Sequence, residues 1–261
     1  MMELSLNVID AAGLMAVAAA AGWVDAVVGG GGLLLIPALL LAFPHMTPSV
    51  ALGTNKLTAI TGTAVAAVTY GRRTKLPRSL ALPAALMAVP AAGFGALTAS
   101  AVPDSWFRPV VMALLIGVAA FVTLRPSFGS VIEDADVITR RRRLMAVAFA
   151  GCGIGFYDGV FGPGTGTFLI MIFTGLLSME FLQSSALAKV VNVGTNLGAL
   201  VVFAAKGDVL WTLGAGMAVC NIAGAALGAR TALKRGSGFV RCVLLVVVTV
   251  MVFKLAIDQF G

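Results

Sequence analysis

Two lysines and two aspartates lie within long apolar stretches of the sequence, where charged side chains are rare. Asp25 and Lys56 belong to the first half of the chain, and Asp158 and Lys189 belong to the second. A charge at the centre of a membrane helix costs roughly 2.5–3.5 kcal/mol on insertion scales. We therefore expect the lysines to face a polar cavity or a charged partner, the alternative being that they snorkel to the membrane interface.

Each aspartate is followed by a run of glycines. Four consecutive glycines follow Asp25, and a Gly-Pro-Gly-Thr-Gly run follows Asp158. Glycine costs about 1 kcal/mol relative to alanine in a helix, so the chain should open at both runs. Backbone N–H groups at the start of the next half-helix bind anions, which makes Gly31, Gly164 and Thr165 candidate ligands. The alternative is that the glycines only permit close helix packing.

Amide and hydroxyl side chains accompany both lysines. Lys189, Asn192 and Asn196 are spaced i, i+3 and i+7 and share one helix face. The segment Thr54-Asn55-Lys56 lies in the first half, with Thr63 at the i+7 position. This combination of groups suits a small anion. The candidate anion ligands are Lys56, Lys189, Asn55, Asn192, Asn196, Thr54, Thr165, Gly31 and Gly164, and Asp25 and Asp158 are the candidate charge-balance or coupling groups.

The composition indicates that lipid is the solvent for most of this surface. Mean hydropathy is +1.01, and 59% hydrophobic with 11% charged residues leave too little polar surface for a soluble globule. We predict an all-α integral membrane protein of about ten helical segments, broken at the Gly-rich runs near its centre. The predicted segments are 6–25, 27–44, 49–70, 79–101, 106–124, 144–160, 163–178, 182–204, 210–229 and 239–257.

The sequence contains an internal repeat. Sliding the chain against itself without a gap superposes Asp25 on Asp158 and, with the same shift, Lys56 on Lys189. Because five segments per copy is an odd number, the second copy should enter the membrane from the opposite face, as an inverted repeat. The predicted domains are a first membrane repeat at 1–125, a polar cytoplasmic linker at 126–143 and a second membrane repeat at 144–261.

Basic residues gather in the connections 71–78, 125–143 and 230–238, which the positive-inside rule places in the cytoplasm. Both termini are then periplasmic. These loops and anionic lipid account for the net charge of +7, so no nucleic-acid partner is needed. Trp106, Trp211 and Tyr70 lie near predicted segment ends, as an interfacial aromatic belt would.

Neither a metal site nor a disulfide framework is expected. The three cysteines, Cys152, Cys220 and Cys242, are an odd number and all lie in apolar segments, where a free cysteine serves as a small packing residue. We therefore expect no cofactor. The sequence leaves open whether the protein forms a homodimer.

The pattern Gly-x-x-Asp-x-x-x-Gly-x-Gly occurs from Gly22 and again from Gly155, and Thr54-Asn55-Lys56 follows its first occurrence. With these motifs the chain resembles the sulfite exporter TauE/SafE family over nearly its whole length. The resemblance implies a multi-pass permease of the bacterial inner membrane, with no enzymatic activity. It also implies that a sulfur-containing anion such as sulfite or an organosulfonate is moved, by export, through a central site formed by both halves.

The two aspartates have two alternative roles in such a permease. As permanent partners of the lysines they keep the empty site neutral, and as titrating groups they couple transport to the proton gradient. We favour the first role for at least one of them, because a nearby lysine stabilises the charged carboxylate. Replacing the lysines by methionine is then expected to remove anion binding and to leave folding largely intact.

Two other functions are compatible with parts of the sequence. A passive anion channel would use the same basic residues. An intramembrane aspartyl protease would need two carboxylates that share a proton, which Asp25 and Asp158 offer. The Gly-x-Gly-Asp segment of such proteases is absent, however, and the lysines would have no role.

Overall fold

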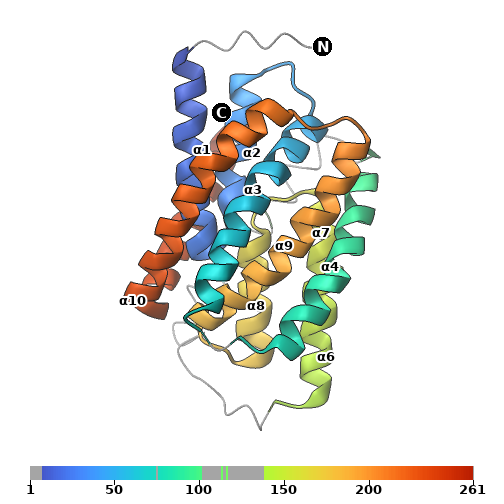
Figure 1. The fold of residues 1–261 in the computed structure, drawn as a ribbon, viewed down its shortest axis with the longest axis vertical. Helices are drawn as coiled ribbons and strands as arrows, with labels where there is room; N and C mark the ends of the chain where they lie inside the picture. The colour runs from blue at the N-terminus through green and yellow to red at the C-terminus, as the bar shows by residue number, and fades with distance from the viewer. Residues whose placement is uncertain (1–7, 75, 102–112, 114–115, 117–137, 261) are drawn as a thin grey trace.

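The computed structural model describes residues 8–74, 76–101, 113, 116 and 138–260, and these residues are helical with no strand (Figure 1). The prediction of an all-α chain is therefore confirmed. In chain order the helices are α1 (Val8–Val28), α2 (Gly31–Ala42), α3 (Pro48–Gly71), α4 (Arg78–Thr98), η1 (Ala99–Ala101), α6 (Arg140–Ala148), η3 (Phe149–Gly153), α7 (Ile154–Val160), α8 (Thr165–Leu177), α9 (Phe181–Ala205) and α10 (Trp211–Phe260).

Four helices in the described part of the chain are long and apolar enough to cross a membrane. α2 and α8 are apolar but shorter, with 12 and 13 residues. The predicted segment 106–124 lies outside the described residues except for positions 113 and 116. The candidate spans are Asp10–Val28, Arg78–Thr98, Phe181–Ala205 and Trp211–Val247.

The chain opens at both glycine runs, as the sequence predicted. α1 ends at Val28 and α2 begins at Gly31, with Gly29 at a φ of 82° between them. α7 ends at Val160 and α8 begins at Thr165, with Gly162 and Gly164 at φ values of 84° and 79°. These left-handed conformations cost other L-residues about 1–2 kcal/mol, which explains why glycine stands at the breaks.

α10 consists of two legs that meet at Gly236. This glycine has φ 76° and ψ −172°, so the helix is interrupted there. Figure 1 shows the C-terminus at the end of the molecule where α10 begins, because the second leg returns along the first. The predicted segments 210–229 and 239–257 fall on these two legs.

The polar connection before the second half is only partly described. Residues 126–137 of the predicted linker lie outside the described residues, whereas Arg140–Arg143 form the first turn of α6. Thr139 caps this helix, because its hydroxyl accepts a hydrogen bond from the Arg142 backbone N–H at 3.3 Å. A π-helical turn, η3, joins α6 to α7.

Close helix packing is the role of several glycines outside the two runs. A Cβ atom at Gly95 would lie 2.2 Å from the Phe156 carbonyl oxygen, where α4 packs on α7. A Cβ atom at Gly228 would lie 2.5 Å from the Trp23 carbonyl oxygen, where α10 packs on α1. These glycines allow the helix backbones to approach, as small residues do in membrane helices. α3 and α9 pack together between these two pairs.

Candidate anion-binding site

Both buried lysines form ion pairs with the aspartate of the other half of the chain. Lys56 Nζ on α3 lies 2.6 Å from Asp158 Oδ2 at the end of α7. Lys189 Nζ on α9 lies 3.4 Å from Asp25 Oδ2 near the end of α1. The lysines are 1% and 0% exposed, so the alternative of snorkelling is wrong and a charged partner is present. In each pair the lysine belongs to one half of the chain and the aspartate to the other half, so the two pairs are crossed between the halves.

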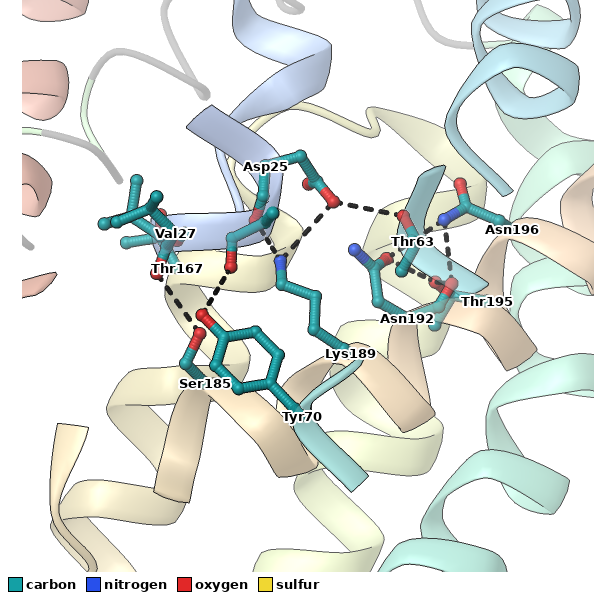
Figure 2. Close-up of polar contacts among 12 residues, drawn as sticks. Asp25, Val27, Thr63, Tyr70, Thr167, Ser185, Lys189, Asn192, Thr195 and Asn196 are labelled. Carbon is teal, nitrogen blue, oxygen red and sulfur yellow. Dashed lines mark hydrogen bonds and ion pairs between the residues drawn. The ribbon is translucent and has the colours of Figure 1, made fainter. Parts of the chain in front are cut away.

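Side chains from other helices bind the backbone at the end of α1. The last four carbonyl groups of a helix lack partners within it. Lys189 Nζ donates to the Asp25 carbonyl, and Tyr70 Oη donates to the Ala26 carbonyl at 3.0 Å. The next two carbonyls accept from Ser185 Oγ at 3.2 Å and Thr167 Oγ1 at 3.0 Å. Figure 2 shows how these donors, from α3, α8 and α9, converge on one helix end.

The Asp25 carboxylate has a second partner on α3. Thr63 Oγ1 donates to Asp25 Oδ2 at 3.0 Å, and Lys189 approaches the same oxygen. In Figure 2 Thr63 lies between Asp25 and the amide groups of α9. The carboxylate is therefore held by a hydroxyl of the first half and an ammonium of the second. Asp25 is 9% exposed, which makes such partners necessary for a charged group.

Asp158 is held by its own half of the chain in addition to Lys56. Thr165 Oγ1, at the start of α8, contacts both Asp158 Oδ1 at 2.5 Å and the Gly162 carbonyl at 2.8 Å. Tyr157 Oη donates to the Pro163 carbonyl at 2.6 Å. The hydroxyl groups of Tyr157 and Thr165 therefore form hydrogen bonds within the break between α7 and α8.

The amides of α9 form a local network on the face that carries Lys189. Thr195 Oγ1 donates to Asn192 Oδ1 at 2.9 Å, and Asn196 Nδ2 donates to the Asn192 carbonyl at 2.8 Å. Asn192 and Asn196 are 5% and 3% exposed. The structure thus brings these two candidate ligands together beside the ion pair of Lys189 with Asp25 (Figure 2).

The two polar neighbours of Lys56 have different surroundings. Asn55 is 3% exposed, and its Oδ1 has no hydrogen-bond partner among the described residues. Its amide nitrogen would lie 3.5 Å from a Cβ placed on Gly32, so Asn55 is next to the start of α2. Thr54 instead accepts a hydrogen bond from the Leu210 N–H at 3.1 Å, which turns it toward the start of α10. Asn55 is therefore next to the α2 start, and Thr54 is not.

The glycines that were candidate ligands stand at the starts of the two short helices. Gly31 is the first residue of α2 and is buried, with its α-carbon close to the Asp25 side chain. Gly164 is the N-cap residue of α8, directly before Thr165. Both helix N-termini therefore lie next to the carboxylates of the ion pairs. Gly29 and Gly166 pack directly on each other. The glycine runs therefore serve both expected roles, since they interrupt the helices and also allow close packing.

The hydroxyl donors Tyr70, Ser185 and Thr167 were not among the predicted site residues. The prediction that Tyr70 belongs to an interfacial belt is wrong, because its side chain is fully buried and its hydroxyl caps α1. Tyr70 follows Lys56 by close to a whole number of helical turns and so shares its face. Ser185 precedes Lys189 by one turn in the same way. Thr167 carries no comparable signal in the sequence.

The described residues contain no cluster of three or more His, Cys, Asp or Glu side chains able to hold a metal ion. The cysteines at 152, 220 and 242 are free, and the first and last of them are exposed. The ionic chemistry of the site therefore comes from lysine and aspartate.

Buried charge within apolar helices is typical of membrane proteins that move ions or other polar solutes. Comparison with known sequences supports that class. The chain is 37% identical to the probable membrane transporter protein ORF9 of Sinorhizobium sp. over 238 residues, 91% of this chain and 89% of the relative. It is 36% identical over 252 residues to the probable membrane transporter protein YfcA of Escherichia coli K12, covering 95% and 90%.

A third relative, a probable membrane transporter protein of Haemophilus influenzae, is 31% identical over 246 residues, 94% of each chain. The family described as sulfite exporter TauE/SafE matches residues 14–255. The chain belongs to this family, and it is a membrane transporter and not an enzyme. No solved structure matches the chain.

Proposed function

We propose that this transporter exports a small sulfur-containing anion, such as sulfite or an organosulfonate, across the bacterial inner membrane by alternating access. The observation that carries the proposal is the pair of crossed Lys–Asp contacts, at 2.6 Å and 3.4 Å, between the two halves. Each contact buries an ammonium group that a substrate anion can bind in place of the carboxylate. The family description supports the sulfur anion as substrate.

In this proposal the substrate is bound by the groups around the two lysines. Lys56 and Lys189 attract the anion, and Asn55, Asn192, Asn196, Thr165 and the backbone at Gly31 and Gly164 coordinate it. Asn55 Oδ1 is a buried polar atom without a partner among the described residues, which supports a role in binding. Thr54 is assigned a minor role, because its hydroxyl is already bonded to Leu210.

We further propose that the two halves are inverted repeats of five segments each. The first residues of α3 and α9, Pro48 and Phe181, are related by the same shift that superposes the two aspartates and the two lysines of the crossed ion pairs. Residues from the basic connections 71–78 and 230–238 line one common pocket, which supports their location on the same face of the membrane. That face is the cytoplasmic one by the positive-inside rule, with both termini in the periplasm.

The crossed pairs give alternating access a physical basis. An ion pair between the halves stabilises the empty protein in one arrangement, and an anion that displaces a carboxylate weakens that arrangement. In the described arrangement both lysines are fully buried, which favours a gated carrier over a passive channel. The carboxylates contact lysines, which leaves neither free to act as half of a proteolytic dyad.

The test is a flux assay in proteoliposomes that contain the purified full chain. Sulfite, sulfate, a short organosulfonate and chloride are supplied separately at two pH gradients. We expect flux that saturates with sulfite or the sulfonate and that is at least tenfold lower with chloride. Flux that rises linearly with concentration for every anion would identify a channel instead.

Variants of the aspartates test their role in the same assay. Asp25→Asn and Asp158→Asn remove one negative charge each while keeping the side-chain volume, and Asp10→Asn on the exposed start of α1 is the matched control. We expect at least a tenfold loss of flux for the first two and none for the control. If both buried variants keep the flux and the pH dependence of the unmodified protein, the carboxylates are structural only.

A further inference from the structure

A second cationic site lies away from the ion pairs, where the α3–α4 connection meets the first leg of α10. A pocket of about 610 Å³ is lined there by Arg72 and Arg73 from the end of α3 and by Arg230 and Lys234 from α10. Leu182 at the start of α9 and Leu233 form its apolar part. The four cationic residues are exposed, and none of them has a carboxylate within ion-pair distance among the described residues.

The hydroxyl groups of the pocket are already engaged. Thr69 Oγ1 donates to the Val65 carbonyl at 2.7 Å, and Thr74 Oγ1 donates to the Tyr70 carbonyl at 2.8 Å. The ligand is therefore met chiefly by guanidinium and ammonium donors. Arginine binds phosphate groups bidentately, and lysine binds them as a point charge. Four cations with no carboxylate partner in the described part of the chain favour a ligand with substantial negative charge.

The location and size of the pocket indicate which kind of anionic ligand it can bind. A volume of about 610 Å³ is that of a site for a whole small molecule, larger than a single tetrahedral anion requires. The pocket combines leucine side chains with four cations at the ends of apolar helices, which matches a headgroup joined to acyl chains. Basic pockets between membrane helices on the cytoplasmic side are suited to anionic headgroups.

We infer that this pocket, lined by Arg72, Arg73, Arg230 and Lys234, binds the phosphate-bearing headgroup of an anionic phospholipid. Two of its cations come from each half of the chain, so the lipid bridges α3 and α10 at the same face of the molecule. The inference does not depend on which anion is transported, and it assigns this surface a ligand other than the substrate.

The test is native mass spectrometry of the purified full chain, titrated in separate arms with phosphatidylglycerol, cardiolipin, phosphatidylcholine and inorganic phosphate. Each cation near an anionic membrane lipid contributes about 1 kcal/mol, or about a fivefold change in affinity. The double variant Arg72→Gln with Arg230→Gln should therefore bind the anionic lipids about 25-fold more weakly. The double variant Arg78→Gln with Arg141→Gln, at exposed positions outside the pocket, is the matched control and should bind as the unmodified chain does.

Thermal unfolding in detergent without added lipid checks that both double variants fold, which is expected because all four positions are exposed. Retention of phosphatidylglycerol or cardiolipin over phosphatidylcholine, lost in the pocket variant alone, supports the inference. Equal binding of phosphatidylcholine, or equal losses in the two double variants, overturns it. Displacement of the anionic lipid by inorganic phosphate at equal concentration overturns the lipid assignment in favour of a soluble anion.

Discussion

The break between α1 and α2 is bonded mainly to distant parts of the chain, whereas the break between α7 and α8 is bonded mainly to itself. The carbonyls that end α1 accept hydrogen bonds from Tyr70, Thr167, Ser185 and Lys189. At the second break Tyr157 and Thr165 bond to groups nearby in the sequence. Its distant contacts include the Lys56 ion pair and the Gly166 N–H, which donates to the Gly29 carbonyl at 3.2 Å.

This difference shows that equivalent sequence motifs can be held by hydrogen bonds from different parts of the chain. The first break cannot shift without disrupting hydrogen bonds to α3, α8 and α9 together. The second break has the local hydrogen bonds of Tyr157 and Thr165, and α8 is also bonded to the first break by Gly166 and Thr167. The first break is therefore held by more helices than the second.

The largest expected effect comes from removing the lysines. Lys189→Met leaves Asp25 buried without its ammonium partner and removes one of the donors to the Asp25 carbonyl, which keeps the Gly29 N–H. This change should lower the free energy of unfolding by about 3–5 kcal/mol. Lys56→Met removes an ion pair but leaves the carbonyls that end α1 bonded, and should cost less. Thermal unfolding in one detergent measures both variants.

The ion pairs change the earlier expectation that Lys→Met leaves folding largely intact. The double variants Lys189→Met with Asp25→Asn and Lys56→Met with Asp158→Asn remove both charges of a pair. They should recover part of the lost stability, because the buried carboxylate is no longer unpaired. Equal losses at Lys56 and Lys189 would contradict the contrast between the two breaks.

The next effect compares two glycines at equivalent positions of the repeat. Gly29 and Gly162 both have left-handed φ values, so alanine at either position costs about 1–2 kcal/mol in strain. An added Cβ at Gly29 would also lie 2.2 Å from the Gly166 α-carbon, whereas at Gly162 the nearest atom is Leu52 Cδ2 at 3.4 Å. Gly29→Ala should therefore lose about a further 1–3 kcal/mol from overpacking.

Thermal unfolding and expression in membranes check this pair of variants. Gly162→Ala serves as the matched control, since it shares the backbone strain and lacks the clash. A Gly162→Ala protein as unstable as Gly29→Ala would show that the second break is packed as tightly as the first.

The smallest effect concerns the two tyrosine hydroxyls. Tyr70→Phe leaves the Ala26 carbonyl at the end of α1 without its donor, at a cost of about 1–2 kcal/mol. Tyr157→Phe removes the local bond to the Pro163 carbonyl, in a partly buried position, and should cost about 0.5–1 kcal/mol. Both variants keep the ring. A larger loss for Tyr157→Phe, measured by thermal unfolding, would show that the second break depends more on its tyrosine hydroxyl than the first.

The sequence identified the charged residues of the site but not their partners. Asp25, Lys56, Asp158 and Lys189 are conspicuous because charge is rare in apolar segments. The internal repeat shows which residues correspond to each other, but correspondence does not say which of them touch. The pairing of Lys56 with Asp158 depends on how the two halves of the chain pack together, which is a tertiary property.

The hydroxyl donors show a second limit of sequence analysis. Serine, threonine and tyrosine are ordinary residues in membrane helices, so Thr167 carries no distinctive pattern, and the one-turn spacing of Ser185 from Lys189 does not by itself mark a donor. Their role follows only from the open end of α1, whose carbonyls need donors. Thr54, in contrast, is at the i−2 position from Lys56 and so lies on the opposite helix face, a spacing that already argues against a shared site.

The crossed ion pairs also bear on how the chain is made. Residues emerge from the ribosome in order, so Asp25 and Lys56 enter the membrane well before Asp158 and Lys189 are synthesised. Each buried charge of the first half therefore has no counter-ion from the second half until that half is synthesised. Expressed alone, residues 1–125 should be degraded or held by the insertion machinery, and co-expression of residues 126–261 in the same cell should rescue them.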